Sequence, residues 1–300
     1  METLFGMSKS PVDVDVVFHN EEQRKQADIK VEKNRRLRYP IYADGETVSG
    51  KITIKLRDGK RIEHQGIRVN FIGSIDLFHE RAKSYPFLSL SQDLAPPGEL
   101  NQQKTEFDFE FKNAEKQYEC FYGINVRLRY YVSLEIARKF SNIVRERDIW
   151  VYAHPTTLPL QVAAANKKME VGIEDCLHIE FEYNKDKYHL QDVIVGRVLF
   201  YLIRIKIKTM ELSIIKRETT GSMPNLYNES ENITKFEIMD GAPIKGETIP
   251  IRLFLGGYEL GPTFQDINKK FSVRYYLNLV LVDEDNRRYF KQHEIFMYRK

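Results

Sequence analysis

A strict alternation of apolar and polar residues recurs along this 300-residue chain and limits its fold more than any other feature. Every second residue is apolar over residues 126–136, 249–255 and 273–281. A period of two gives a strand one buried and one exposed face, which is typical of antiparallel sheets. The pattern therefore predicts an all-β chain, in which the best helical candidate, residues 88–93, is barely one turn long. Turn residues separate the expected strands at Asp44-Gly45, Asp58-Gly59, residues 184–187, Asp240-Gly241 and residues 283–286.

The second half of the chain repeats features of the first. Gly50 lies inside a strand pattern, and Gly196 lies inside a similar pattern in the second half. The run Arg-Tyr-Tyr at residues 129–131 recurs at residues 274–276. The distance along the chain between these two runs is nearly the same as that between Gly50 and Gly196. Matches in the same order at a constant spacing indicate a tandem duplication. A glycine inside a strand marks a kink, a bulge or a close approach of another backbone.

The duplication predicts two tandem antiparallel β-sandwiches joined by a short hinge. We expect an N-terminal sandwich over residues 1–158 and a C-terminal sandwich over residues 159–300. The joint is expected within residues 154–166, which contain two prolines and a run of alanines.

The composition of the chain indicates its cellular compartment and the kind of partner it could bind. The net charge is only +3, so the chain as a whole gives no electrostatic reason to bind nucleic acid. Two cysteines in 300 residues favour a reducing, cytoplasmic compartment over secretion. A local basic stretch suits either a solvated loop or contact with an anionic membrane or acidic partner; its members are Lys30, Lys33, Arg35, Arg36 and Arg38.

The sequence offers little for catalysis, a cofactor or a metal. Its seven histidines are scattered, without the spacing of a zinc site. His178 and His189 could meet across the turn at residues 184–187 as a two-histidine metal site, although strand histidines are more often hydrogen-bonded. Cys176 and His178 are two residues apart, but nothing supplies an orienting group or an oxyanion hole. We therefore expect a non-enzymatic protein and keep a metal-dependent enzyme as the minor alternative.

Apolar residues stand directly beside one of the turn signals. Ile238 and Met239 precede Asp240-Gly241, and apolar side chains at a loop tip are exposed unless something covers them. From the residues alone, ordinary core packing and a partner site are equally good explanations.

Longer motifs resemble a known family. They are DGETVSGK at residues 44–51, HQGIR at 64–68, PGEL at 97–100, NVRLRY at 125–130, MEVGIEDCLHIEFEY at 169–183, IMDGAP at 238–243 and RRYFKQ at 287–292. In order and nearly without gaps, these resemble the vacuolar protein sorting-associated protein 26 family, the arrestin-like subunit of retromer. The resemblance runs from about Val12 to Lys300.

This resemblance implies an arrestin fold with a polar patch buried between its two sandwiches. It also implies an adaptor on the cytosolic face of endosomes, where retromer returns transmembrane cargo to the Golgi or the cell surface. The implied partners are the α-solenoid subunit (vacuolar protein sorting-associated protein 35), a PX-domain sorting nexin and the cytosolic tails of cargo. The alternative is a stand-alone arrestin-related receptor adaptor that ignores the solenoid.

The resemblance also implies three binding sites. The solenoid subunit would contact the loop formed by Ile238, Met239, Asp240, Gly241, Ala242 and Pro243. A cargo tail would add a strand beside the sorting nexin, at a groove formed by Val171, Tyr289, Phe290 and Lys291. A PDZ-bearing sorting nexin would bind near Asp44.

Overall fold

The computed structural model describes residues 10–32, 35–57, 61–79, 83–152, 166–222 and 224–299. These residues form 22 strands and two short 3-10 turns, η1 (Glu21–Gln23) and η2 (Leu255–Gly257), which confirms the all-β prediction. Among the residues so described, no helix is long and apolar enough to cross a membrane.

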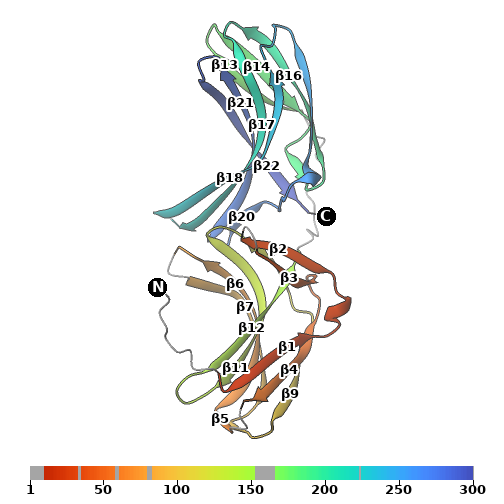
Figure 1. Ribbon diagram of the computed structural model, residues 1–300, viewed down its shortest axis with the longest axis vertical. Coiled ribbons are helices and arrows are strands. Elements are labelled where there is room, and N and C mark those ends of the chain that lie inside the picture. The colour runs from red at the N-terminus through yellow and green to blue at the C-terminus, as the bar shows by residue number, and fades with distance from the viewer. Residues whose placement is uncertain are drawn as a thin grey trace. The chain divides into compact units, whose positions relative to one another are not determined.

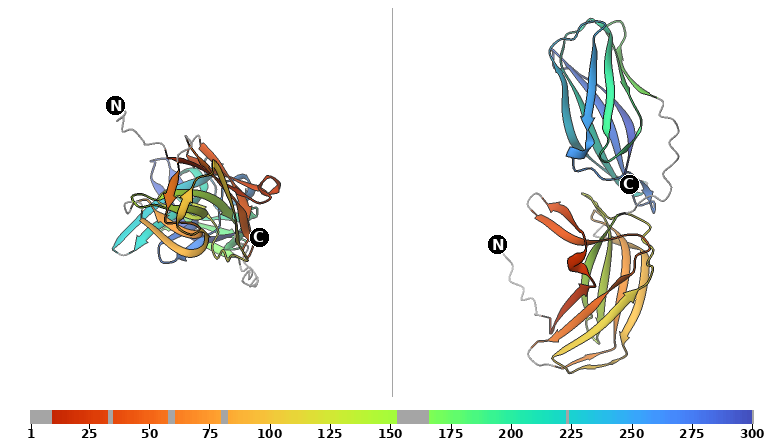
Figure 2. Two further views of the ribbon diagram at one scale, coloured as in Figure 1. Left: turned by 90° about the horizontal axis from the view of Figure 1, so that it is seen from below. Right: turned by 90° about the vertical axis from the view of Figure 1, so that its right-hand side faces the viewer.

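The chain divides into two compact units, Met1–Ala153 and His154–Lys300. Each unit contains two sheets that form facing layers (Figure 1), and Figure 2 shows the same layers from two further sides. The predicted boundary between residues 158 and 159, and nearly all of the predicted joint, lie outside the described residues.

The first unit packs a small sheet against a large one. A tilted ring pair, Phe71 with Phe111 at 5.8 Å between ring centroids, joins the two layers in the core. The small sheet has the order β1 (Val12–Phe18), β4 (Val48–Leu56), β9 (Lys104–Phe111). The large sheet has the order β2 (Gln26–Glu32), β3 (Arg35–Tyr42), β12 (Ile143–Val151), β11 (Val126–Ala137), β6 (Gly66–Leu77), β7 (Lys83–Ala95), with β10 (Phe121–Tyr122) beside β11, while β5 (Ile62–His64) and β8 (Gly98–Leu100) form a separate ribbon.

The second unit has the same plan. The Tyr183 hydroxyl and Nδ1 of His293 lie 3.0 Å apart and connect its two layers. One sheet has the order β13 (Lys167–Ile173), β14 (Leu177–Tyr183), β16 (Val193–Ile203), β19 (Thr248–Phe254). The other has the order β15 (Lys187–His189), β22 (Arg288–Tyr298), β21 (Phe271–Asp283), β17 (Ile207–Ser222), β18 (Asn225–Asp240), with β20 (Phe264–Ile267) beside β21.

Strand pairing supports the duplication. In both large sheets an antiparallel run ends in one parallel pair, β12 with β3 in the first unit and β22 with β15 in the second. Tyr130 and Tyr275, matched in the sequence repeat, are both fully buried. Each hydroxyl accepts a backbone hydrogen bond, from Tyr118 N at 3.0 Å and from Gly261 N at 3.1 Å. A buried tyrosine hydroxyl needs such a partner, and both copies keep it.

The best helical candidate in the sequence also lies in a strand, as the all-β prediction requires. Residues 88–93 lie in the middle of β7, where they pair with β6 in an antiparallel ladder. Leu88, Ser89, Leu90 and Ser91 alternate with a period of two, and a neighbouring strand is available to pair with them. Pairing with a neighbouring strand therefore outweighed the weak local preference of these residues for a helix.

The two repeated glycines mark close backbone approaches. A Cβ added to Gly50 on β4 would lie 2.3 Å from the carbonyl oxygen of Val17 and 2.8 Å from the Phe109 ring. A Cβ added to Gly196 on β16 would lie 2.3 Å from the carbonyl oxygen of Glu182 and 2.8 Å from the Phe181 ring. Each central strand therefore fits between its neighbours only without a side chain at this position.

Alanine at either glycine should be strongly destabilising. Because the new methyl group meets a backbone oxygen and a buried ring, we expect Gly50→Ala and Gly196→Ala each to lower the free energy of unfolding by about 3 kcal/mol. Urea denaturation of the purified chain measures this. Gly98→Ala is the matched control, because its Cβ would have no neighbour closer than 3.8 Å. Equal losses for all three variants would contradict the packing argument.

Candidate partner-binding sites

The loop after β18 is fixed at both ends. Gly241, at φ 116°, turns the chain out of β18, and its N–H donates to Lys208 O at 2.8 Å. At the far end, Gly246 N donates to Phe200 O at 2.7 Å and Phe200 N donates to Glu247 O at 3.1 Å. The loop is thus anchored to β17, through Lys208, and to β16, through Phe200. Anchoring at two strands presents its side chains in a defined position.

The tip of this loop is not sealed inside its own sandwich. Ile238 and Met239 are half-buried at the end of β18, whereas Pro243 is buried. Ile244 is 71% exposed, and its N–H donates to the Glu247 carboxylate at 2.9 Å. Sequence reasoning missed Ile244 as a surface residue. Its position could have indicated exposure, because it lies one residue beyond the IMDGAP motif and between Gly241 and Gly246. Both glycines take positive φ.

The edge of β22 carries the predicted groove residues. Along residues 288–294 the described strands pair with β22 on one side only, through β21, while β15 pairs with residues 296–298. Phe290 is 63% exposed, and Lys291 beside it is exposed. Tyr289 is half-buried and donates its hydroxyl proton to Asp283 at 2.9 Å. An edge with unpaired backbone groups is a template for an added strand.

Val171 lies on a neighbouring strand but is not open to solvent. It sits on β13, which packs beside β22, and it pairs with Ile179 of β14. Its exposed fraction is 6%. The structure therefore places the four predicted groove residues on two adjacent strands, with Phe290 and Lys291 exposed and Val171 buried.

Asp44 caps the turn between β3 and β4. Its Oδ1 accepts hydrogen bonds from Gly45 N at 2.9 Å and from Lys116 N at 2.6 Å, while the residue itself is exposed. Gly45 has φ 70°, a conformation that favours glycine. One carboxylate oxygen is thus used by the turn. The rest of the group faces solvent on a fixed backbone.

A buried lysine, Lys116, forms hydrogen bonds that hold this turn in place. Lys116 is 1% exposed, and its Nζ donates to the carbonyl oxygens of Glu46 at 2.6 Å and Ala114 at 2.8 Å. Burial lowers the pKa of Lys116 to about 8, and the charges of Glu46 and Asp44 offset part of this effect. The ammonium therefore bears a desolvation cost that carbonyl hydrogen bonds and two carboxylates only partly relieve.

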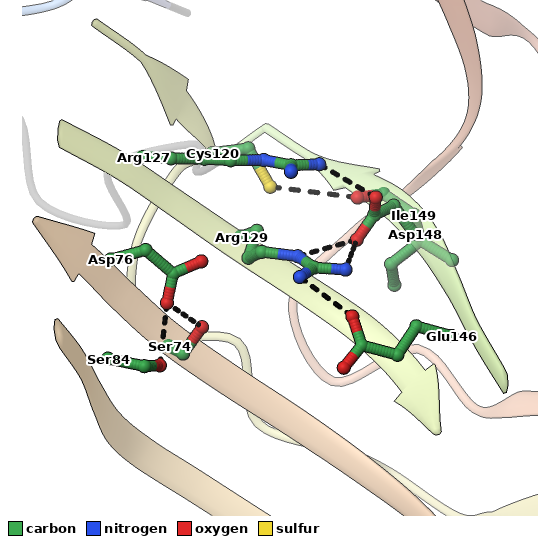
Figure 3. A network of polar contacts seen from close by, with 9 residues as sticks. All are labelled: Ser74, Asp76, Ser84, Cys120, Arg127, Arg129, Glu146, Asp148 and Ile149. Atoms are coloured by element: carbon green, nitrogen blue, oxygen red, sulfur yellow. Dashed lines mark hydrogen bonds and ion pairs between the residues drawn. The ribbon is translucent and has the colours of Figure 1, made fainter. Parts of the chain in front are cut away.

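An ion-pair network covers part of the outer face of the large sheet in the first unit (Figure 3). Asp148 on β12 accepts from Arg127 Nη2 at 2.7 Å and Arg129 Nε at 2.7 Å, both on β11. Arg129 also pairs with Glu146 at 2.9 Å. These groups are half-buried except for the more exposed Glu146, and Arg129 lies 3.9 Å over the Tyr131 ring. Each of these ion pairs joins β11 to β12, which are neighbouring strands of the same sheet.

The two cysteines, Cys120 and Cys176, lie in different units of the chain. Burial raises the pKa of the Cys120 thiol to about 12, so this residue stays protonated. Cys176 lies half-buried in the turn between β13 and β14. Within the parts of the chain that the structure describes, no group of three or more His, Cys, Asp or Glu residues could hold a metal ion.

The proposed meeting of two histidines was wrong. His178 lies on β14, which pairs with β16, whereas His189 lies on β15, which pairs with β22 in the other sheet. The rings pack on different tyrosines, His178 on Tyr201 and His189 on Tyr298. The chain crosses from one layer to the other at residues 184–187, so this turn does not form a hairpin that would bring the rings together.

Two repeated antiparallel β-sandwiches in tandem define an arrestin-like class of protein. Comparison with known proteins gives the family: residues 8–286 match the family described as Vacuolar protein sorting-associated protein 26. The chain belongs to this protein-sorting family, which confirms the resemblance seen in its motifs.

Several relatives match along nearly the whole chain. Vacuolar protein sorting-associated protein 26B of Mus musculus is 56% identical over 299 residues, which cover 99% of this chain and 88% of the relative. Vacuolar protein sorting-associated protein 26B-A of Xenopus laevis is 55% identical, with 99% and 87% covered. Vacuolar protein sorting-associated protein 26B-like of Danio rerio is 56% identical over 297 residues, with 99% and 88% covered.

Lys116 should give the stability a measurable pH dependence. Its folded pKa of about 8 lies below the ordinary value of 10.5, so between these values the unfolded chain holds a proton that the folded chain has released. The cost of burying the charge is complete below pH 8 and fades as the pH rises. We expect the free energy of unfolding to rise between pH 8 and about pH 10, by at most about 1.4 kcal/mol per pH unit from this group.

Urea denaturation across this range, on the native chain and on Lys116→Met, measures the contribution of the lysine. The variant has no group to titrate at this position, so its unfolding free energy should rise less steeply. Identical slopes for the two proteins would contradict the assignment.

Proposed function

We propose that this chain is a non-enzymatic adaptor subunit of the retromer coat, acting peripherally on the cytosolic face of endosomes. It would link the α-solenoid subunit, vacuolar protein sorting-associated protein 35, to a PX-domain sorting nexin and to the tails of transmembrane cargo. The process served would be retrograde endosome-to-Golgi and recycling transport. The observation that carries this proposal is the half-exposed apolar end of β18, on a loop that is hydrogen-bonded at both ends.

The geometry of that loop suits a protein interface. Ile238, Met239 and Ile244 present apolar side chains around Gly241, and the anchors to Lys208 and Phe200 hold the loop in place. Preorganisation lowers the entropy lost on binding, so more of the contact energy is available as affinity. Apolar anchors at the centre of an interface typically account for most of its binding energy.

Cargo and the sorting nexin would use the edge of β22. A tail that paired with residues 288–294 would satisfy the open side of the strand by main-chain hydrogen bonds. Specificity would come from the side chains beside it, above all the exposed Phe290 ring. Val171, being buried, would form the floor under this edge.

Asp44 would supply a negative charge to a PDZ-bearing sorting nexin. Its turn is held by Lys116 and closed by Gly45, so the carboxylate position is set before a partner arrives. Only one of the two carboxylate oxygens is required to accept those backbone hydrogen bonds. The other remains available to a partner.

Substituting the apolar end of β18 should abolish solenoid binding. We expect Ile238→Asp with Met239→Asn to weaken the affinity by roughly 1,000-fold, equivalent to about 4 kcal/mol, because two anchors at one interface are lost. Ile244→Asp should weaken it about tenfold without touching the core, because this residue is largely exposed. Isothermal titration calorimetry with the purified solenoid subunit measures both effects.

The control is a pair at the other end of the same strand. Leu226→Asp with Tyr227→Asn replaces two exposed apolar residues of β18, which are 42% and 46% exposed, and should leave the affinity unchanged. Circular dichroism checks that all variants are folded. Unchanged affinity in both loop variants would reject the site and favour a receptor adaptor that works without the solenoid.

Phe290 should determine binding of a cargo tail in the presence of the sorting nexin. We expect Phe290→Glu to weaken binding of a peptide with an aliphatic anchor by at least tenfold, since the ring beside the added strand is replaced by a charge. Phe254→Glu on β19 is the matched control, because Phe254 is 64% exposed on an edge strand of the other sheet. Fluorescence anisotropy of a labelled tail reports the affinity. A larger loss in the Phe254 variant would place the groove elsewhere.

A further inference from the structure

The basic stretch found in the sequence forms a two-stranded ribbon. Residues 30–38 span the end of β2 and most of β3, and Lys33 lies outside the described residues. In the antiparallel register Lys30 lies opposite Arg36, and Asp28 lies opposite Arg38. Directly opposed residues share a face, so these four side chains lie together on one side of the ribbon. All four are exposed.

The other side of the ribbon faces the protein. Ala27 and Tyr39 lie opposite each other and are both buried, and the Tyr39 ring stacks on Trp150 of β12 at 6.0 Å. Ile29 and Leu37, also directly opposed, are half-buried. The ribbon therefore has a fixed orientation: its apolar side is anchored, and its charged side is directed away from the core.

The charges on this ribbon are not arranged for stability. Lys30 and Arg36 are like charges at directly opposed positions, which disfavours the strand pair. Arg36 reaches Asp28 at 3.6 Å, but both groups are about half exposed, and such pairs contribute little. Among the described residues, Lys30, Arg35 and Arg38 have no ion pair. In all, β2 and β3 carry four described cations and two acidic residues.

The ribbon also extends beyond its sheet. β3 pairs with β12 only through Ile41 and Tyr42. Over residues 26–38 the two strands pair only with each other among the described strands. A two-stranded ribbon offers no groove to enclose a peptide. Its long, exposed cations suit a broad, flat and diffusely charged surface instead.

We propose that the charged face of the β2–β3 ribbon is a contact site for an anionic phospholipid membrane, with Lys30, Arg36 and Arg38 as the contacting residues. The inference rests on the proposed peripheral location of the chain and adds the lipid class and the contacting residues. Each cation close to an anionic leaflet strengthens binding by roughly a factor of five. Such a contact is weak alone and adds to the affinity supplied by coat partners.

Vesicle co-sedimentation of the full chain without partners tests this. The probes are vesicles of phosphatidylcholine alone and of phosphatidylcholine with 30% phosphatidylserine, a composition chosen for the assay, at about 0.1 M salt. We expect the chain to sediment only with the anionic vesicles and to be released at about 1 M salt, where the Debye length falls to about 3 Å. The joint substitution Lys30→Ala, Arg36→Ala and Arg38→Ala should lower the partition coefficient roughly 100-fold.

A control with the same loss of charge separates the ribbon from the rest of the surface. Lys187→Ala, Lys235→Ala and Arg252→Ala remove three exposed cations from the second unit and should leave most of the binding intact. Thermal unfolding provides a second readout, because removing the Lys30–Arg36 repulsion should leave the ribbon variant at least as stable as the native chain. If the ribbon variant is as stable as the native chain, unfolding does not explain its loss of vesicle binding.

Three results would overturn the proposal. They are equal binding to neutral and anionic vesicles, equal losses in the ribbon and control variants, or binding of a glutamate-rich peptide by the ribbon without vesicle binding. Calorimetry with the solenoid subunit is independent of all three. Absence of vesicle binding by the native chain, with intact solenoid binding, rejects the ribbon proposal alone. Unchanged solenoid affinity in both β18 loop variants rejects the solenoid site alone.

Discussion

An aromatic ring lying over a strand glycine fixes the central strand of the small sheet in each unit, and the candidate loops depend on these strands. Phe109 covers Gly50 on β4, and Phe181 covers Gly196 on β16. The Asp44 turn leads directly into β4, and the loop after β18 is hydrogen-bonded to Phe200 on β16. Close packing at each glycine therefore sets where the adjoining loop is presented. The covering ring comes from the later strand β9 in the first unit and from the earlier strand β14 in the second, whereas both large sheets keep their buried tyrosine.

The remaining features show what such a fold buries and what it leaves at its surface. Each sandwich satisfies its interior by alternating apolar residues and leaves its surface to loops and edges. Its buried titratable groups serve structure: Lys116 bonds to carbonyl oxygens beneath a turn, and Cys120 lies in the core with a raised pKa. The ion pairs of Arg127 and Arg129 with Asp148 are made within one sheet. What remains at the surface is an apolar loop, an open strand edge, a carboxylate on a turn and a basic ribbon.

Much of this could be predicted from the sequence, because period-two patterns and turn residues are local properties. The strands around residues 126–136 and 273–281 followed directly from alternation, and the repeat followed from matched motifs at constant spacing. The separation of His178 and His189 could not be predicted, because sheet membership depends on distant strands that a local pattern cannot identify. For Ile244 the sequence showed only its position between Gly241 and Gly246, because its exposure also depends on how the loop is tied to Phe200.

The division of β22 between two partners has a further consequence. β15 occupies the outer side of residues 296–298, so the free edge ends there, leaving the seven residues from Arg288 to Glu294. At about 3.3 Å per residue, this free length is roughly 23 Å. A polypeptide laid along it must leave the sheet when it reaches β15, however long it is. For a tail that adds to this edge as proposed, β15 would limit the paired segment to a short linear motif, whatever the length of the tail on either side.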